Sequence, residues 1–415
     1  MNKRWFAVLL CILMLLLCGC EQRQPAMTGP KVSKEGIEEF YARKAAAATA
    51  VSEENVLMSD KGEKVLGSDL LRSEVSAVTF LNTLESKGAE SWDVSQGQNG
   101  SVWAWTVPNG NRFDLYIAAA WGIFAPEDMG GFFENYSNLT AVDFGSVLDT
   151  GNTVNMDSMF RGCENLRDLD LSSLNTAAVT DMGAMFEGTS ALSALDLSSF
   201  DASSVTDMEA MFRGSGISRL ELGDIDTGSV RSMASMFEGC GNLTRLDLSK
   251  LDTGSVTDME AMFRDCAALE EVNLTGFSTG SVRSMAHMFE RSGIRTLDVG
   301  MFDTSRVETM ESMFGFCWEL RELDLRSFDT ARVETMASMF YDCSSLEYVD
   351  VTSFNTACVE DMRNMFYHDQ QLQTPDVSGF DVSSVKYFDD FMLPGVKING
   401  KPWQEMFTAK HTIYD

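Results

Sequence analysis

Residues 328–346 read Phe-Asp-Thr-Ala-Arg-Val-Glu-Thr-Met-Ala-Ser-Met-Phe-Tyr-Asp-Cys-Ser-Ser-Leu, and this stretch decides the fold because close copies of it recur along the chain. The Met-Phe pair at its centre occurs nine times, at spacings of 25 or 26 residues. The nine pairs begin at Met159, Met185, Met211, Met236, Met262, Met288, Met313, Met339 and Met365. A period of this length is typical of a repeat array, in which each unit buries apolar side chains against its neighbours.

Each unit has two halves with different apolar periodicities. Residues 192–200 carry apolar side chains with strand-like alternation and match the strand half of a leucine-rich repeat. Residues 205–212 carry them at offsets of three, six and seven, which places them on one face of a short helix. Ten strand registers follow one another from Leu139 to Leu372. We therefore predict an α/β solenoid, a right-handed leucine-rich-repeat-type array of about ten strand–short-helix units with a parallel sheet, capped at both ends.

These units resemble the 26-residue repeat of BspA-like leucine-rich-repeat surface proteins, which also occurs in mycoplasma lipoproteins. The resemblance covers about residues 137–392 and rests on nine consecutive copies. It implies a cell-surface protein, in several members of the family an adhesin or a host-interaction factor. The family has no catalytic residues to carry over. Its ligands differ between members, so the resemblance names no partner.

The first residues indicate export and lipid anchoring. Lys3 and Arg4 precede an apolar run over residues 5–17, which is short for a membrane span and typical of a secretory signal. The run ends in residues 17–20, Leu-Cys-Gly-Cys, which resemble a bacterial lipobox. The resemblance implies cleavage before Cys20 and lipid attachment to its sulfur; the alternative is an ordinary cleaved signal peptide. No later stretch is apolar enough to span a membrane, so we expect a single lipid anchor in the cell envelope and display of the protein on the cell surface.

The chain divides into five expected segments around this array. They are a signal peptide (1–19), a tether (20–35), an N-terminal helix and β-hairpin cap region (36–136), the repeat solenoid (137–392) and a C-terminal cap (393–415). Within the N-terminal cap, a hairpin over residues 101–117 places Trp103 and Trp105 on one face. That face forms either the core of the cap or a sugar-stacking platform. An Asn399-Gly400 turn closes the other end.

Five cysteines occupy one slot, three residues after the phenylalanine of the unit. They are Cys163, Cys240, Cys266, Cys317 and Cys343. Thr189, Ser215, Ser292 or Asp369 fills the slot in other units, so it accepts small side chains and demands no thiol chemistry. We expect a ladder of buried thiols. Disulfides between the neighbours 240 and 266, or 317 and 343, remain an alternative because adjacent strands lie about 4.8 Å apart.

An acidic column is the main candidate for a binding site. The strand register places its residues on the outer face of the sheet: Asp170, Asp196, Glu221, Asp247, Asp298, Asp324, Asp350 and Asp376, interrupted by Asn273. Stacked carboxylates repel one another by roughly 1 kcal/mol per pair in water. Either solvent and the flanking arginines Arg219, Arg245, Arg295 and Arg321 relieve this repulsion, or the column binds a cationic protein or Ca²⁺. No other cofactor is expected.

A second polar column follows the last apolar residue of the strand half. It consists of Asn175, Asp201, Asp226, Asp252, Asp303, Asp329, Asn355 and Asp381. Asp and Asn side chains commonly accept hydrogen bonds from backbone N–H groups two residues further on. We interpret this second column as structural.

Charge and motif content narrow the function. The formal net charge of −30 argues against nucleic acid, because phosphate binding needs a Lys/Arg surface. The three histidines lie in no recognisable catalytic motif, so we expect no enzyme. The sequence predicts a surface-displayed lipoprotein that acts as an adhesin or ligand-binding scaffold for an extracellular protein or glycan. The alternative is a structural envelope lipoprotein that faces the periplasm or the cell wall.

Overall fold

The computed structural model describes residues 55–411, which all belong to one compact unit. The signal peptide, Cys20, the tether and most of the expected helix near residues 36–57 lie outside the described residues. Strands and turns dominate the described part, and its one α-helix is α3 (Gln404–His411). None of the helices in that part is both long and apolar enough to cross a bilayer.

A six-stranded mixed sheet joins the N-terminal region to the first repeat units. Its strands, in spatial order, are β2 (Trp92–Asp93), β3 (Val102–Asn109), β4 (Arg112–Ala119), β1 (Val75–Leu81), β6 (Ala141–Asp143) and β8 (Asp168–Leu169). The β3–β4 hairpin is antiparallel, whereas β1 pairs in parallel with both β4 and β6. The short 3-10 helix η1 (Arg72–Glu74) leads into β1. The sheet therefore continues from the cap into the repeats without an exposed edge at their junction.

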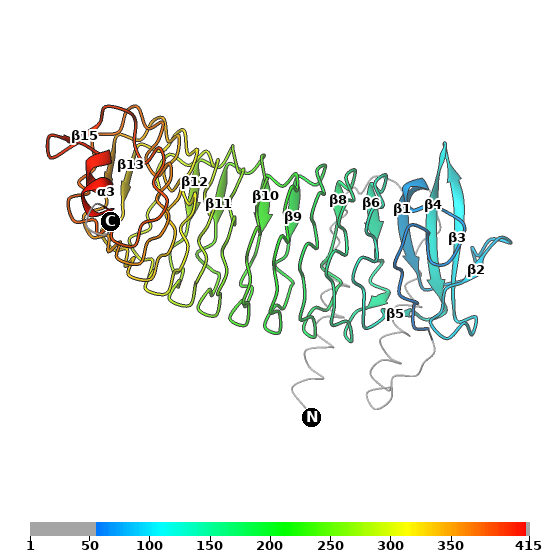
Figure 1. Cartoon of the computed structure of the whole chain (residues 1–415). Helices are drawn as coiled ribbons and strands as arrows, with labels where there is room; N and C mark the ends of the chain where they lie inside the picture. The colour runs from blue at the N-terminus through cyan, green and yellow to red at the C-terminus, as the bar shows by residue number, and fades with distance from the viewer. Residues whose placement is uncertain (1–54, 412–415) are drawn as a thin grey trace, which may run out of the picture. The chain divides into compact units, whose positions relative to one another are not determined.

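Later units contribute short parallel strands in matched register. These strands pair as β9 (Ala194–Asp196) with β10 (Arg219–Glu221), β11 (Arg245–Asp247) with β12 (Glu271–Asn273), and β13 (Glu322–Asp324) with β14 (Tyr348–Asp350). Figure 1 shows β9, β10, β11 and β12 following one another along the array. One further parallel pair, β5 (Ile123–Phe124) with β7 (Leu148–Asp149), lies beside the first units. Strands occur in eight of the ten expected registers; the units that begin at Ile294 and Leu372 have none.

The prediction of a short helix in each unit is wrong. Residues 205–212 form a chain of hydrogen-bonded turns instead. Ala210 has a φ of 54°, which an α-helix does not allow. The N–H groups of Ala210 and Phe212 donate to carbonyl groups of the next unit, at 2.8 and 2.9 Å, and not to their own chain four residues back. The apolar spacing still places the side chains on one face, but the backbone bonds are made between units.

A ladder of backbone bridges joins the turn halves of successive units. The bridging residues are Asp128, Asn155, Asp181, Asp207, Ser232, Asp258, Ser284, Thr309, Thr335, Asp361 and Tyr387. Each residue contacts its equivalent in the next unit, so the ladder starts before the boundary expected at residue 137. Neighbouring units are therefore bonded on two sides, through the strands and through these turns.

The core is a set of side-chain columns that run through the units. Ten phenylalanines stack face to face, with ring centroids 5.2–5.8 Å apart and planes within 12° of parallel. They are Phe133, Phe160, Phe186, Phe212, Phe237, Phe263, Phe289, Phe314, Phe340 and Phe366. The two methionine columns beside them are also buried, for example Met259 and Met262. The large number of methionines in this chain thus serves packing between units.

Buried threonines form a polar ladder inside this apolar core. The hydroxyl of Thr253 donates to the carbonyl oxygen of Ser278 at 3.0 Å and accepts the N–H of the same residue at 2.8 Å. The hydroxyls of eight threonines donate to the next unit in this way: Thr150, Thr176, Thr227, Thr253, Thr279, Thr304, Thr330 and Thr356. A buried hydroxyl without a partner is costly, so the ladder favours one register of stacking.

The shared cysteine slot is buried, as expected. All five cysteines are free thiols, and each sulfur donates to a phenylalanine carbonyl of the preceding unit, as Cys266 does to Phe237 at 3.0 Å. Burial raises the pKa of the Cys240 thiol to about 11, so it stays protonated and unreactive at neutral pH. Asp369 occupies the same slot, and burial raises the pKa of its carboxyl to about 8.

Each of the two 25-residue units has a glycine at the place where one residue is missing, and the backbone there requires it. Both contain Ser-Gly-Ile, at residues 215–217 and 292–294. A Cβ atom on Gly216 would lie 2.0 Å from the carbonyl oxygen of Ser190, and one on Gly293 would lie 2.3 Å from that of Ala267. The shorter loop draws the backbone so close to the preceding unit that no side chain fits.

Caps cover both ends of the described array. At the C-terminal end, β15 (Lys397–Ile398) and β16 (Lys401–Pro402) form a hairpin around Asn399 and Gly400, both of which have positive φ, so the predicted turn is confirmed. Trp403 and Phe407 pack next to Phe391, whose ring meets that of Phe366 edge-on and ends the phenylalanine stack.

The two tryptophans of the N-terminal hairpin have different surroundings. Trp105 is buried and stacks on Tyr116, with ring centroids 5.6 Å apart. Trp103 is half-buried, and the ammonium group of Lys87 lies 3.0 Å from its ring centroid. The indole of Trp105 therefore belongs to a small core on this face of the sheet, and a lysine already occupies the face of Trp103.

Candidate functional site

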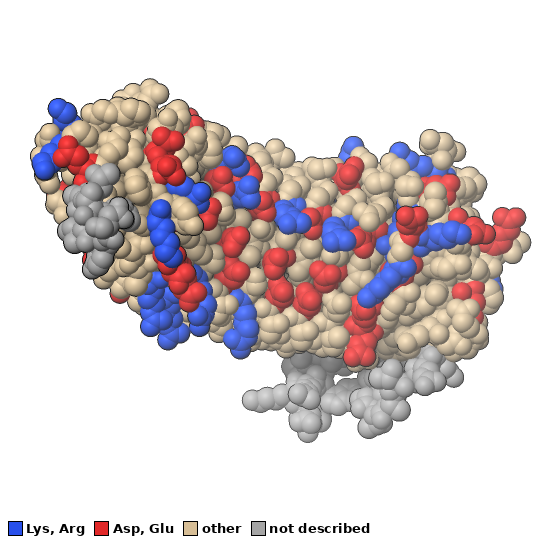
Figure 2. Space-filling model, in the orientation of Figure 1, with Lys and Arg blue, Asp and Glu red and all other residues tan. Residues whose placement is uncertain are grey.

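The acidic column lies on the outer face of the strands, as the strand register predicts. Seven of its eight acids are exposed and Asp350 is half-buried. Figure 2 shows that acidic and basic side chains intermingle on the face in view and do not separate into two fields. The face in view is therefore a mixed-charge surface and not a continuous anionic field.

Most of these acids also shape the backbone. The N–H group two residues further on donates to the carboxylate of seven of them: Asp170, Asp196, Asp247, Asp298, Asp324, Asp350 and Asp376. The second polar column makes the same bond at all eight of its positions, which confirms its structural interpretation. Both columns end a straight segment at a turn, so the structural role predicted for the second column applies to these acids as well.

Hydrogen bonds lower the pKa values of several column aspartates. The side chain of Arg326 bonds Asp324 and lowers the pKa of its carboxyl to about 2. Hydrogen bonds from Ser198 and Thr352 lower the pKa values of Asp196 and Asp350 in the same way. These carboxylates therefore carry full charge at neutral pH.

The flanking arginines relieve the column less than expected. Arg245 and Arg321 lie 3.7 and 3.8 Å from Glu271 and Glu347, which stand beside the column and not in it. Arg295 likewise pairs with two glutamates outside the column, Glu270 and Glu319. Of the four expected arginines, only Arg219 meets a column acid, Glu221, at 3.1 Å.

The calcium alternative lacks a ligand set in the described part of the chain. Within residues 55–411, no group of three or more Asp, Glu, His or Cys side chains is arranged to hold a metal ion. Each column aspartate binds a backbone N–H of its own turn, and the carboxylates follow one another in a line. Ca²⁺ needs six to eight oxygen ligands that converge on one point.

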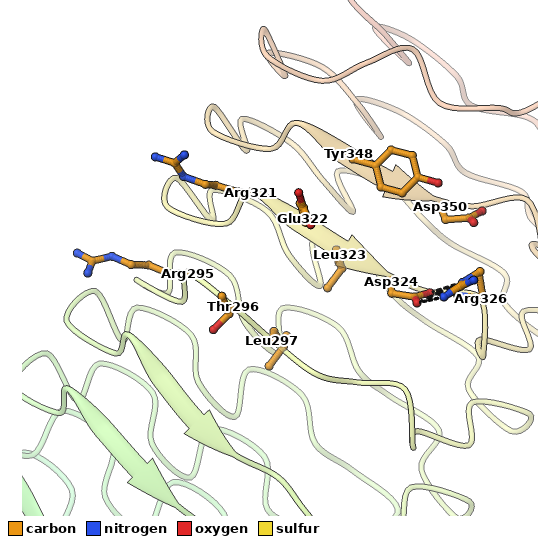
Figure 3. A pocket seen from close by; sticks show the side chains of 10 residues that line it. All are labelled: Arg295, Thr296, Leu297, Arg321, Glu322, Leu323, Asp324, Arg326, Tyr348 and Asp350. Atoms are coloured by element: carbon orange, nitrogen blue, oxygen red, sulfur yellow. Dashed lines mark hydrogen bonds and ion pairs between the residues drawn. The ribbon is translucent and has the colours of Figure 1, made fainter.

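A hollow interrupts the strand face where three units meet (Figure 3). Its volume is about 650 Å³. It is lined by Arg295, Thr296, Leu297, Arg321, Glu322, Leu323, Asp324, Arg326, Tyr348 and Asp350. The unit that begins at Ile294 has no strand, and it meets the regular pair β13–β14 at this place. The hollow thus contains two residues of the predicted column, Asp324 and Asp350.

The hollow combines charge, an aromatic ring and an apolar floor. Tyr348 is 50% exposed, whereas Leu323 in the neighbouring strand is buried. Arg326 holds Asp324 through its Nε atom at 2.9 Å, and Figure 3 shows the guanidinium groups of Arg295 and Arg321 directed away from this pair. Such a lining can recognise a polar ligand by hydrogen bonds and ring stacking.

Tyr348 was not among the predicted site residues. It is the first residue of β14, and the matching position holds Ala194, Arg219, Arg245, Glu271 or Glu322 in the other repeat strands. A single aromatic residue in a register of polar or small residues was the available signal. No sequence signal indicated the hollow itself, because the hollow forms where the unit that begins at Ile294 has no strand.

Comparison with known families decides the classification. A model of the family described as "Mycoplasma protein of unknown function, DUF285" matches residues 127–240, 215–317 and 292–402. The chain belongs to this DUF285 family. The three overlapping matches follow one another along more than half of the chain, as expected for tandem repeats of one DUF285 type. No curated protein and no solved structure matches the chain.

Proposed function

We propose that this chain is a non-catalytic binding scaffold, anchored by lipid at Cys20 and displayed on the cell surface, which binds an extracellular protein or glycan. The observation that carries the proposal is the hollow around Tyr348. The hollow joins a unit without a strand, an exposed aromatic ring and mixed charge in one place. Exposed aromatic residues are enriched at binding surfaces because they supply large contact area with little loss of conformational entropy.

The same proposal includes a leucine-rich-repeat-type solenoid of right-handed sense. Matched parallel registers, two sets of inter-unit backbone bonds and the unbroken phenylalanine stack support it. In such an array each unit contacts only its neighbours, and the strand side presents a broad surface for ligands. The unit is strand and turns, not strand and helix.

A second candidate function is a structural envelope protein without a partner. It is favoured by the hydrogen bonds of the acidic column, because turn formation alone explains seven of the eight acids. Trypsin treatment of intact cells separates the two functions. Surface display predicts loss of the repeats from live cells, and Cys20→Ser should release the protein from the membrane fraction. Repeats that are cut only after lysis would support the structural candidate.

We expect Tyr348→Ala to weaken ligand binding at least tenfold. The full chain is first screened on panels of extracellular-matrix proteins and glycans, and the variant is then measured on each hit. Loss of a buried aromatic contact at an interface centre commonly costs about 2 kcal/mol or more. The fold should not change, because half of the side chain is solvent-exposed.

The acidic column provides the matched controls for this measurement. The double variant Asp324→Asn and Asp350→Asn retains an acceptor for each turn, as Asn273 does naturally, and alters only the charge in the hollow. The double variant Asp170→Asn and Asp196→Asn makes the same change outside it. Binding that falls equally with both pairs, or that survives Tyr348→Ala, would place the ligand elsewhere.

A further inference from the structure

A column of alternating charge runs along the turn halves of the units. The residue after each stacked phenylalanine is, in order, Glu134, Arg161, Glu187, Arg213, Glu238, Arg264 and Glu290. Neighbours in this column pair across units, Arg161 with Glu134, Arg213 with Glu187, and Arg264 with both Glu238 and Glu290. The next three units abandon the alternation and place Gly315, Tyr341 and Tyr367 there. We call the first seven residues the charge ladder.

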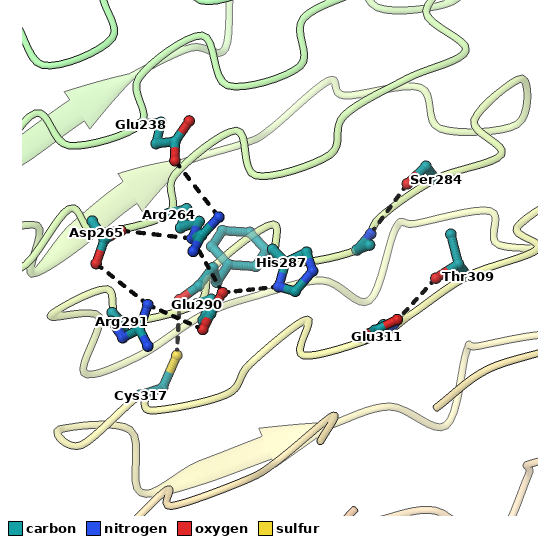
Figure 4. Close-up of polar contacts among 12 residues, drawn as sticks. Glu238, Arg264, Asp265, Ser284, His287, Glu290, Arg291, Thr309, Glu311 and Cys317 are labelled. Carbon is teal, nitrogen blue, oxygen red and sulfur yellow. Dashed lines mark hydrogen bonds and ion pairs between the residues drawn. The ribbon is translucent and has the colours of Figure 1, made fainter. Parts of the chain in front are cut away.

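The carboxylate of Glu290, the last in the charge ladder, contacts three basic side chains (Figure 4). The side chain of Glu290 is 7% exposed. Its carboxylate oxygens lie 3.2 Å from a side-chain nitrogen of Arg264, 3.3 Å from one of Arg291 and 2.8 Å from one of His287. Arg291 also lies over the ring of Phe316, 4.7 Å from its centroid. The ladder therefore ends in an internal contact between a guanidinium group and an aromatic ring.

Beyond the ladder, three units contribute an aromatic cluster. It consists of Phe316, Trp318, Tyr341, Tyr367 and His368. Phe316 meets Tyr341 at 4.9 Å and Trp318 at 5.9 Å between ring centroids, and Tyr367 meets His368 at 4.4 Å. Trp318 is 42% exposed. The regular units need no aromatic residue at these turns, so packing of the array does not explain the cluster.

Two carboxyl groups, those of Asp342 and Asp369, lie in the same turns as the cluster and form no ion pair within the described residues. Asp342 accepts the indole N–H of Trp318 at 3.4 Å, and among the described residues no Lys, Arg or His pairs with it. Asp369 is buried; its Oδ1 atom accepts the N–H of Cys343 at 2.8 Å, and its Oδ2 atom has no hydrogen-bond partner in the described part of the chain. Burial keeps the Asp369 carboxyl largely protonated at neutral pH, so the turns around Trp318 combine aromatic rings with one unpaired carboxylate, that of Asp342.

Cations already cover aromatic rings that are at least partly exposed elsewhere in this chain. Lys87 lies over Trp103 and Arg363 lies over Tyr387. Within residues 55–411, no such cation lies over Trp318. An ammonium or guanidinium group is attracted both by the face of an indole and by a neighbouring carboxylate. The net charge of −30 adds a long-range attraction for a basic partner.

We propose that the aromatic cluster and Asp342 form a second binding site, which takes a lysine or arginine side chain from a basic peptide segment of a partner protein. The indole of Trp318 offers its face to the cation, and the Asp342 carboxylate neutralises it. The site lies on the turn halves, whereas the hollow around Tyr348 lies on the strand face. It is therefore independent of the function proposed above.

The experiment titrates the detergent-solubilised full chain with fluorescent octa-arginine and octa-lysine peptides and follows anisotropy. We expect Trp318→Ala and Asp342→Asn each to weaken peptide binding roughly tenfold, and Trp318→Phe to retain part of it because a phenyl ring binds cations less strongly than an indole. Tyr387→Ala, which removes an exposed aromatic ring that Arg363 already covers, should bind as the parent does. Thermal melting curves establish that each variant is folded.

Two outcomes would overturn the proposal. Peptide affinity that is the same in the parent and in Trp318→Ala would show attraction by the net charge alone, which salt abolishes. Binding of an uncharged oligosaccharide such as chitohexaose that is lost in Trp318→Ala, with peptide binding unchanged, would make the cluster a glycan platform instead. If Trp318→Ala fails to fold, Trp318→Phe and Asp342→Asn still decide the question.

Discussion

Replacing Arg72 with methionine is expected to lower the free energy of unfolding by about 3–5 kcal/mol at neutral pH, because it leaves a buried carboxylate without its cation. Arg72 and Asp60 are 2% and 5% exposed, and Nη2 of the arginine lies 3.1 Å from Oδ2 of the aspartate. The guanidinium group also donates to the carbonyl oxygens of Gly131 and Glu134, at 2.9 and 2.7 Å. It therefore ties the segment before β1 to the first turns of the array.

The loss should depend on pH in a defined direction. Burial raises the pKa of Asp60 above its ordinary value, and Arg72 opposes that rise. Without Arg72 the folded-state pKa rises further, so the folded variant prefers the protonated acid. A group with a raised folded-state pKa favours folding at acidic pH and loses that contribution as the pH rises through the folded-state pKa. The deficit of Arg72→Met should thus shrink toward pH 4.

Urea unfolding followed by circular dichroism at several pH values measures this effect. The matched control is the double variant Arg72→Met and Asp60→Asn, which removes both charges. It should recover part of the lost stability, because no isolated buried charge remains. A double variant that is less stable than Arg72→Met alone would mean that Asp60 matters for its bonds to Leu66 and Tyr136 and not for its charge.

Phe263→Ala is expected to destabilise the array by about 3–5 kcal/mol through the cavity that it leaves. Phe263 is fully buried and stacks between Phe237 and Phe289, with ring centroids 5.8 and 5.4 Å away. Both neighbours lose a partner, and each unit contacts only the units beside it. The array should therefore lose cooperativity at this point as well as stability, which urea unfolding curves would show as a lower and broader transition.

Glu260→Gln is the control in the same unit. Glu260 is exposed and accepts a hydrogen bond from the hydroxyl of Ser284 at 3.2 Å, which a glutamine oxygen also accepts. We expect a change of about 0.5 kcal/mol or less. A larger loss for Glu260→Gln than for Phe263→Ala would mean that the assignment of inner and outer faces is reversed.

The candidate site was predictable only in part. The alternation of residues in the strand half places Asp324 and Asp350 on the outer face, and the structure finds both there, in the hollow. Both aspartates also accept the N–H group two residues further on, from Arg326 and Thr352, a bond that the sequence interpretation assigned to the second column alone. Tyr348 required a comparison of equivalent positions across units. The hollow could be predicted only if it were known that the unit at Ile294 forms no strand, and the apolar pattern of that unit does not reveal this.

The sequence by itself determined the period, the inward-facing columns and the turns, because these depend on which residue types recur at which spacing. Whether the second half of each unit is a helix or a chain of turns was decided only by tertiary structure. Offsets of three, six and seven place side chains on one face in either case, and the backbone N–H groups choose between them by bonding to their own segment or to the next unit. The buried contact of Arg72 with Asp60 and Tyr136 was likewise decided by the fold, since it joins groups that are distant along the chain and adjacent only after the cap docks on the first unit.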